Sequence, residues 1–277
     1  MMDFGWWTTG RDQAAIELFD AVWKAMEYGV IPGKISYVFC SKARGEGACS
    51  DRLMDMASMR GIPVASISAA RFMPELRAVD RDRWRGLYHG AVLDAVKGFH
   101  QDVVVLAGYM WVVGPELCRS FSILNLHPAL PGGPCGTWQE VIWQLIRERA
   151  GLTGVMMHLV TPELDRGPAI TCCTFQIRGD NWDILWQQLD KSLKTSGLDE
   201  IKASYGEAQP LFAAIRREGV KRETPLIVQT LRSLATGDIS IKDGRPFDRF
   251  GRALETPYDL TPEIEALFQT DVKRHGE

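Results

Sequence analysis

Apolar residues in this chain follow two spacings, one typical of strands and one of helices. Short unbroken apolar runs alternate with stretches whose apolar residues return every three or four positions. Strands that are apolar on both faces and alternate with helices indicate a mostly parallel sheet with helices on both faces. We therefore expect an α/β, Rossmann-like fold. The expected strands are residues 4–7, 35–40, one beginning at 61–64, and 102–107; the expected helices are one that follows Gly10 and carries Ala15, Phe19, Val22, Trp23 and Met26, and those over residues 51–60 and 84–98.

A further strand, helix and strand are expected in the middle of the chain. Ile123 and Leu124 begin a short buried strand that runs into a loop rich in proline and glycine, and residues 154–160 form another apolar run. Between them, Thr137 and Glu140 have the spacing of a capping box, in which each side chain accepts a hydrogen bond from the other residue's backbone N–H. This spacing predicts a helix that begins after Thr137 and packs an apolar stripe into the core.

The pattern changes after about residue 178. Residues 180–209 are polar and helix-prone without a strand, and residues 210–234 again show an amphipathic helical pattern. The rest is rich in Asp, Gly and Pro, which is typical of a segment that wraps a surface. We expect a catalytic core over residues 1–178, a helical insertion with C-terminal helices packing on the core over 179–240, and a surface tail over 241–277.

The composition is that of a soluble globular protein. Of the 277 residues, 45% are hydrophobic and 24% are charged, and the net charge is −3. This charge provides no basic surface for nucleic acid or acidic lipid. No apolar run approaches the roughly 18 residues of a membrane span, and no cationic leader opens the chain. We expect a cytoplasmic protein whose partner is a small molecule, without nucleic acid or membrane.

Neither cysteine nor histidine has the spacing of metal ligands. The six cysteines contain no C-x-x-C pair and the five histidines no H-x-x-x-H pair, whereas a zinc site draws on such clusters. We therefore expect no metal. Cys40, Cys172 and Cys173 lie in apolar, strand-like runs, which favours buried reduced thiols.

Candidate chemistry lies where the strand that begins at Ile123 ends. Side chains alternate on a strand, so Asn125 and His127 face the same side. An imidazole can move a proton or donate a hydrogen bond, and an amide can stabilise an oxyanion. The same two residues also suit a purely structural role, in which they hold the proline-rich turn.

A second motif agrees with the first. Asp165 lies in a later loop, beside a glycine. Three segments in order resemble the folate-dependent formyltransferases, most closely those that act on glycinamide ribonucleotide in purine biosynthesis. They are Asn-x-His-Pro at 125–128, His-x-Val-Thr-x-Glu-Leu-Asp-x-Gly-Pro at 158–168, and the segment 106–115. The resemblance covers residues 4–178 and a short piece at 215–239.

The resemblance implies a formyltransferase-type fold and an enzyme that moves a formyl group from 10-formyltetrahydrofolate to a primary amine. Glycinamide ribonucleotide is the first candidate for that amine. Such a transfer needs an oxyanion to be stabilised and a proton to leave the amine. The resemblance assigns Asn125 and His127 to the oxyanion, and Asp165 to orienting His127 and passing the proton.

The resemblance also implies two binding regions. The folate pterin is expected against the backbone of Tyr109, Met110, Trp111, Val112 and Val113 and against Glu163, Leu164 and Gly167. The amine acceptor is expected beside Thr9, Gly10, Arg11, Asp12, Gln13 and Pro128.

Two positions depart from the family's pattern. Asp12 stands where the acceptor loop has a second glycine, so its carboxylate would either repel a phosphate or cap the next helix while Arg11 supplies a positive charge. Lys221 stands where a later helix has a carboxylate facing the amine. Glu218 or Glu223 could take over that role, unless this helix face is simply solvated.

Other activities stay open. A formyltetrahydrofolate hydrolase shares the Asn-His-Asp arrangement, although that family has Asn-x-His-His where this chain has His127-Pro128. A transferase for an amino-sugar nucleotide is another alternative, whereas one for initiator tRNA fits poorly without a basic patch. A non-catalytic folate binder fits poorly because all three polar residues are kept, and such residues are costly to leave unpaired in an apolar cleft. A homodimer is left open.

Overall fold

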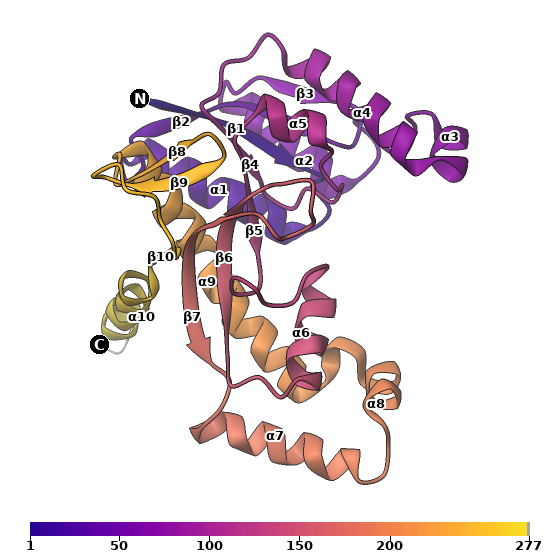
Figure 1. The fold of residues 1–277 in the computed structure, drawn as a ribbon, viewed down its shortest axis with the longest axis vertical. Coiled ribbons are helices and arrows are strands. Elements are labelled where there is room, and N and C mark those ends of the chain that lie inside the picture. Colours follow the sequence, from indigo (N-terminus) through magenta and orange to yellow (C-terminus); the bar gives the residue numbers. More distant parts are fainter. Residues whose placement is uncertain (276–277) are drawn as a thin grey trace. The chain divides into compact units, whose positions relative to one another are not determined.

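The computed structural model describes the backbone of residues 1–275 and the side chains of residues 1–269. The chain divides into two compact units, which are described in turn (Figure 1). The first unit contains Met1–Leu126, His158–Pro168 and Ile227–Glu255. The second contains His127–Met157, Ala169–Leu226 and the chain from Thr256 onward.

An eight-stranded, mostly parallel sheet confirms the predicted α/β class. Its strand order is β10-β7-β6-β5-β4-β1-β2-β3. The Val160 N–H donates to the Ile123 carbonyl (2.8 Å), which joins the end of β6 to the start of β5, so β6 runs antiparallel to β5 and the sheet is mixed. The strands are β1 (Met2–Thr8), β2 (Gly33–Cys40), β3 (Val64–Ser66), β4 (Val103–Leu106), β5 (Ile123–His127), β6 (Leu152–Leu159), β7 (Ala169–Gln176) and β10 (Tyr258–Asp259).

Helices follow the strands, and those predicted from periodicity are present. The capping box at α6 is confirmed, because Thr137 Oγ1 accepts from the Glu140 N–H (3.3 Å) and Glu140 Oε2 accepts from the Thr137 N–H (2.7 Å). The helices of the first unit are α1 (Gln13–Glu27), α2 (Ala48–Met59), α3 (Pro74–Val79), α4 (Arg81–Val96) and α5 (Pro115–Ser120). Those of the second are α6 (Trp138–Arg147), α7 (Asp180–Leu193), α8 (Leu198–Tyr205), the short η1 (Gly206–Ala208) and α10 (Thr261–His275), while α9 (Pro210–Ala235) passes from the second unit into the first.

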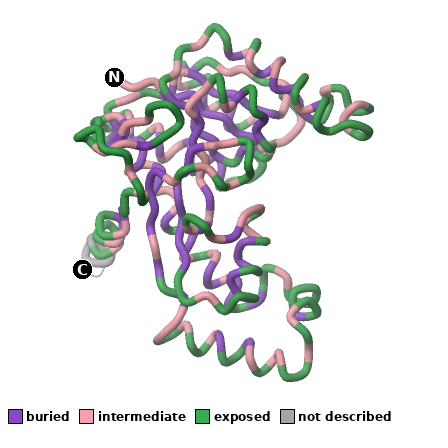
Figure 2. Tube along the Cα trace, in the orientation of Figure 1, coloured by how far each residue is buried: buried purple, intermediate pink, exposed green. Residues whose placement is uncertain are grey.

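Aromatic side chains dominate the core of the first unit. The ring of Trp7 packs against Phe39 and Tyr109 at centroid distances of 5.3 and 5.9 Å, and its Nε1–H donates to Tyr37 Oη (2.9 Å). β1 and β4 are buried over most of their length (Figure 2). Because large rings bury much apolar area and pair in defined geometries, they fix β1 and the loop that follows β4 relative to each other.

A buried histidine joins α4 to the start of α5. His89 is 1% exposed, and its Nδ1 accepts a hydrogen bond from the Gly114 N–H (3.2 Å). The proton of the neutral ring therefore lies on Nε2, which has no partner among the described residues. This contact fixes the end of the segment 107–114, within which the pterin-binding backbone was expected.

The core of the second unit is built on α6. Trp143 of α6 packs against Phe212 of α9 at 5.0 Å between ring centroids. Trp186 of α7 is buried, donates to the Ile177 carbonyl (2.6 Å) and lies 3.7 Å from the Arg178 guanidinium. The helix-prone stretch 180–209 therefore forms two helices, α7 and α8, with apolar residues from both in this core.

The C-terminal segment contains more regular structure than its composition predicted. β8 (Ile239–Lys242) and β9 (Arg245–Asp248) form an antiparallel pair in the first unit, and β10 adds a parallel edge strand beside β7 in the second. α10 is held to α9 by Arg222, which is 7% exposed and donates through Nε to Glu265 (2.8 Å). A buried guanidinium with a carboxylate partner is a stable way to fasten a terminal helix.

The predicted burial of the three strand thiols is confirmed. Cys40, Cys172 and Cys173 are buried and unbridged. Burial raises the pKa of Cys172 and of Cys173 to about 11, since removal from water disfavours the thiolate. These thiols act as small core residues and not as nucleophiles.

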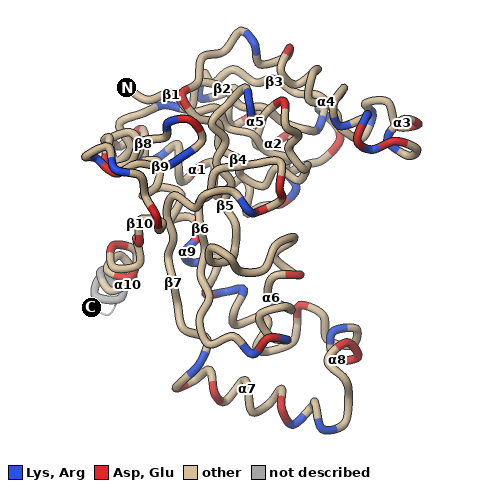
Figure 3. The backbone as a smooth tube through the Cα atoms, in the orientation of Figure 1, with Lys and Arg blue, Asp and Glu red and all other residues tan. Residues whose placement is uncertain are grey.

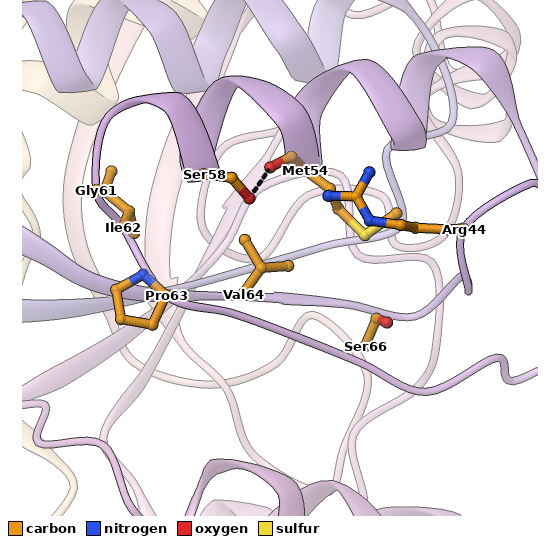
Figure 4. A pocket seen from close by; sticks show the side chains of 8 residues that line it. All are labelled: Arg44, Met54, Ser58, Gly61, Ile62, Pro63, Val64 and Ser66. Carbon is orange, nitrogen blue, oxygen red and sulfur yellow. Dashed lines mark hydrogen bonds between the residues drawn. The ribbon is translucent and has the colours of Figure 1, made fainter.

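A surface hollow of about 470 Å³ lies between α2 and β3 in the first unit (Figure 4). Two of its polar side chains are already engaged, since Ser58 Oγ donates to the Met54 carbonyl (2.9 Å) and Arg44 binds Asp55 (2.5 Å). No predicted site residue lines it. Lys and Arg are interspersed with Asp and Glu along α4 and α9 (Figure 3). No helix in the described part of the chain is long and apolar enough to cross a membrane.

We predict that acid destabilises the fold through His89. Burial, with a smaller effect of Arg85, lowers the pKa of His89 from 6.5 to about 4. Because the folded-state pKa is depressed, the stability that the neutral ring contributes is complete above pH 6.5. It is lost as the pH falls from 6.5 toward 4, by about 3 kcal/mol in all.

His89→Asn keeps an acceptor for the Gly114 N–H without a titrating ring. Urea unfolding of both proteins across that pH range should show a smaller fall in the free energy of unfolding for the variant. Parallel pH dependences in the two proteins would show that His89 is not the responsible group.

Candidate active site

Three polar side chains meet in the first unit, where β5 lies beside β6. Asn125 Nδ2 is 3.1 Å from His158 Nε2. This His158 nitrogen is also 3.7 Å from Asp165 Oδ1. The side chains of His158 and Asp165 are 2% and 7% exposed. The structure thus brings two predicted catalytic residues, Asn125 and Asp165, to one imidazole.

That imidazole belongs to a residue that was not predicted as part of the site. His158 lies in the apolar run of β6, where a single histidine is more often a satisfied core residue. The signal that identifies it is the strand register, because the bond from Val160 to Ile123 places residue 158 opposite Asn125. The two residues are 33 positions apart in the sequence, so local periodicity could not show their contact.

His127 is the last residue of β5 and belongs to the second unit. It is 2% exposed, and its Nε2 lies 2.9 Å from the Pro134 carbonyl. A carbonyl can only accept, so Nε2 carries the proton and donates. The bond ties down the proline-rich loop, which is the structural role considered for this residue. A catalytic role would be additional and stays a prediction, and the neighbouring Pro128 is half-buried.

The loop that carries Asp165 is closed at its base. The Leu159 N–H donates to the Pro168 carbonyl (2.9 Å), and a Cβ added at Gly167 would overlap the Leu159 carbonyl oxygen. Asp165 itself has a left-handed φ of 54°, a conformation that Asp tolerates better than most residues. Gly167, predicted as a pterin contact, is therefore required first for the shape of this loop, in which Glu163 and Leu164 are exposed.

The residues expected to face the pterin alternate between the core and the surface. Tyr109 and Val113 are buried, and Trp111 packs its ring against Trp84 at 5.2 Å. The side chains that point inward hold the segment in place, while the side chains of Met110 and Val112 are exposed.

Thr9 connects the expected acceptor loop to that same segment. Its N–H donates to the Gly108 carbonyl (3.1 Å), and its hydroxyl accepts from the Met110 N–H (3.0 Å) and bonds the Ser41 hydroxyl (2.8 Å). Gly10 has a φ of 55°, and a Cβ there would lie 2.7 Å from Ser50 Cα. The loop 8–10 is thus fixed by its own neighbours.

Asp12 is the N-cap of α1. Its Oδ1 accepts from the Ala15 N–H (3.2 Å), and its Oδ2 lies 3.3 Å from Arg11 Nε. Both charged side chains are about half exposed. Of the two roles considered for this carboxylate, capping is the one the structure has, with Arg11 beside it. Gln13 donates to Glu17 on the helix surface (3.1 Å).

The glutamates of α9 both have basic partners. Glu218 Oε1 binds Lys221 Nζ (2.6 Å), and Glu223 Oε1 binds Arg216 (2.6 Å). Neither contact singles out one glutamate for the acceptor amine. Among the described residues, no three His, Cys, Asp or Glu side chains are grouped as a metal site would require.

Comparison with known families decides the family. The formyl transferase model matches residues 14–184, which is more than half of the chain. This chain belongs to the formyl transferase family. The matched segment includes β5, β6 and the loop that carries Asp165.

One curated member of the formyl transferase family is the chloroplastic phosphoribosylglycinamide formyltransferase of Vigna unguiculata. It is 29% identical over 154 residues, which make up 54% of this chain and 44% of that protein. The chain thus spans less than half the length of that relative.

Solved structures share the fold over most of the chain. Glycinamide ribonucleotide transformylase 1 from Symbiobacterium toebii has a TM-score of 0.61 at 19% identity, covering 92% of this chain and 95% of that one. A formyltetrahydrofolate deformylase from Pseudomonas syringae pv. tomato has a TM-score of 0.59 at 18% identity, covering 89% and 65%. Identities this low establish a common fold alone.

Gly167→Ala should slow a reaction that uses the cluster of Asn125, His158 and Asp165 at least about tenfold, because the base of the loop must open and carry Asp165 away from His158. Gly86→Ala on α4 is the matched control, since its added Cβ meets nothing within 4 Å and alanine favours a helix. Steady-state rates and thermal midpoints of both variants would be measured. A Gly167→Ala enzyme with the wild-type rate would mean that this loop need not be closed.

Proposed function

We propose that this chain transfers a formyl group from 10-formyltetrahydrofolate to a primary amine, with glycinamide ribonucleotide as the acceptor. The observation that carries the proposal is the buried contact of Asn125 and Asp165 with His158, within the segment matched by the formyl transferase family. The name of the Vigna relative supports the acceptor.

The site residues suit the two needs of the reaction. An amide N–H held in a nearly dry cluster stabilises a developing oxyanion more than it would in water, because little water competes for it. Asn125 supplies that donor. His127 supplies a second one in its imidazolium form, through Nδ1–H, because its Nε2–H already donates to the Pro134 carbonyl. Asp165, with a side chain that is 7% exposed, takes the proton that leaves the amine, through a water molecule. It passes this proton on to the folate nitrogen, whose bond to the formyl carbon breaks, so that tetrahydrofolate leaves.

10-Formyltetrahydrofolate supplies the formyl carbon, and two loops of the first unit fit its ring system. Met110, Val112 and Leu164 are 47%, 41% and 51% exposed, although each lies in a segment whose backbone is fixed by neighbours. Exposed apolar side chains on a fixed backbone suit a flat heteroaromatic ligand, and the backbone beside them offers donors and acceptors for its edge.

Hydrolysis of the same donor is the second candidate, because the fold is also that of a formyltetrahydrofolate deformylase. In hydrolysis water takes the place of the amine. The sequence His127-Pro128 resembles the transferases and not the hydrolases. The two activities differ in one observable, which is turnover without an acceptor.

The decisive measurement is folate release by absorbance, with glycinamide ribonucleotide, with an amino-sugar nucleotide and with no acceptor. We expect release to require glycinamide ribonucleotide. Asn125→Ala, His127→Ala and Asp165→Asn should each lower that rate by roughly two to four orders of magnitude, while folate binding changes far less. Rapid release without acceptor would replace transfer by hydrolysis, and near-normal turnover of His127→Ala would remove that residue from the mechanism.

The acceptor loop gives a separate prediction about the phosphate of the acceptor. Arg11→Ala should raise KM for glycinamide ribonucleotide several-fold and leave kcat nearly unchanged, because it removes binding that ground and transition states share. Asp12→Asn keeps an N-cap for α1 but removes the negative charge, so it should lower the same KM. Both effects should shrink at higher salt.

A loss of activity in Asp12→Asn would contradict this assignment. The carboxylate would then be needed to bind an amine or hydroxyl of a different acceptor. Asp12→Gly, which also removes the cap, separates the effect of charge from that of helix stability.

A further inference from the structure

We infer that His158 is a positioning residue that fixes which atom of the Asn125 amide faces the reacting group. The inference rests on the proposed function, since it gives Asn125 its catalytic use. It adds a residue that acts by presenting an unprotonated Nε2 to the Asn125 amide.

The first step is the protonation of the ring. His158 is 2% exposed, and its Nδ1 lies 2.9 Å from the carbonyl of Leu159. A carbonyl oxygen accepts and cannot donate, so Nδ1 carries a proton. In a neutral imidazole the other nitrogen, Nε2, then presents a lone pair.

The second step is the orientation of the amide. Asn125 Nδ2 lies 3.1 Å from His158 Nε2, a distance at which the amide N–H donates to that lone pair. The amide nitrogen is therefore turned toward β6. Its second N–H, about 120° from the first, remains as the donor that an oxyanion needs.

The third step concerns the carboxylate. Asp165 Oδ1 is 3.7 Å from the same Nε2, which is beyond hydrogen-bond distance. A second proton on the ring would reverse this arrangement, because Nε2–H could no longer accept from the amide N–H. It would donate instead, either to Asp165 or to the amide oxygen, which would have to turn toward the imidazolium. One proton on His158 thus decides whether Asn125 offers a donor or an acceptor.

The tautomer can be measured without any substrate. In ¹⁵N NMR of the imidazole groups at neutral pH, His158 should show a protonated, pyrrole-type Nδ1 and an unprotonated Nε2. The signal is identified by its absence in His158→Gln. A proton on Nε2, alone or with Nδ1, would overturn the inference. Because this readout needs no turnover, it stands apart from any failure of the proposed function.

Kinetics test the path through Asn125. His158→Leu should lower kcat roughly ten- to a hundredfold with little change in KM, as expected when an oxyanion donor is no longer aligned. His158→Gln keeps an acceptor near the Nε2 position and should recover most of the rate. Thermal midpoints would show whether His158→Leu is folded. If His158→Leu does not fold, the rate of His158→Gln and the NMR signal of the wild-type protein still test the inference.

A double-mutant cycle supplies the sharpest comparison. If His158 acts through Asn125, the variant Asn125→Ala/His158→Leu should be no slower than Asn125→Ala alone. The matched cycle combines His158→Leu with Asp165→Asn. If the two single-variant losses in kcat multiply in the Asn125 cycle but not in the Asp165 cycle, His158 acts through the carboxylate and the inference is overturned.

Discussion

The amide of Asn125 and the imidazole of His158 share one hydrogen bond between neighbouring strands, and the orientation of both groups depends on it. A buried donor or acceptor without a partner costs about 1–3 kcal/mol, so each group strongly constrains the other. The register of β5 and β6 makes this pairing available, and the Leu159 carbonyl satisfies the other ring nitrogen. The expected oxyanion donor is thus held by a sheet, which positions it more rigidly than a loop would.

The segment expected to contact the pterin is held by hydrogen bonds at both of its ends. At its start Thr9 bonds both Gly108 and Met110, and at its end the ring of His89 accepts from Gly114. Between these anchors the chain exposes Met110 without losing its shape. Because the segment is already ordered, little conformational entropy is lost when a ligand binds it, and this increases the affinity without additional contacts.

Sequence periodicity predicted the longer helices α1, α2, α4, α6 and α9, the helical stretch 180–209 and the central strands, because their apolar spacing is local. It did not predict α3, α5 or α10. It missed the strands β8 to β10, which are short, rich in polar residues and defined by partners far along the chain, as Tyr258 is by Thr171. In the site, the motifs located Asn125 and Asp165. The second motif begins with His158 but assigned it no role, since that role arises from strand register. The motifs also did not show that the Thr9 hydroxyl is occupied, because its partner Ser41 follows a different strand.

The start of α1 shows how one side chain can shift a loop between two uses. An N-cap and a bound phosphate compete for the same free N–H groups. Asp12 already accepts from Ala15, and a capping bond of this kind contributes about 1 kcal/mol. Repulsion between its charge and a phosphate about 4 Å away would cost roughly 1–4 kcal/mol, depending on exposure. Arg11 offsets only part of that cost, because an exposed ion pair contributes little. For the proposed phosphorylated acceptor, we therefore expect this loop to set the affinity and not the rate of the chemical step.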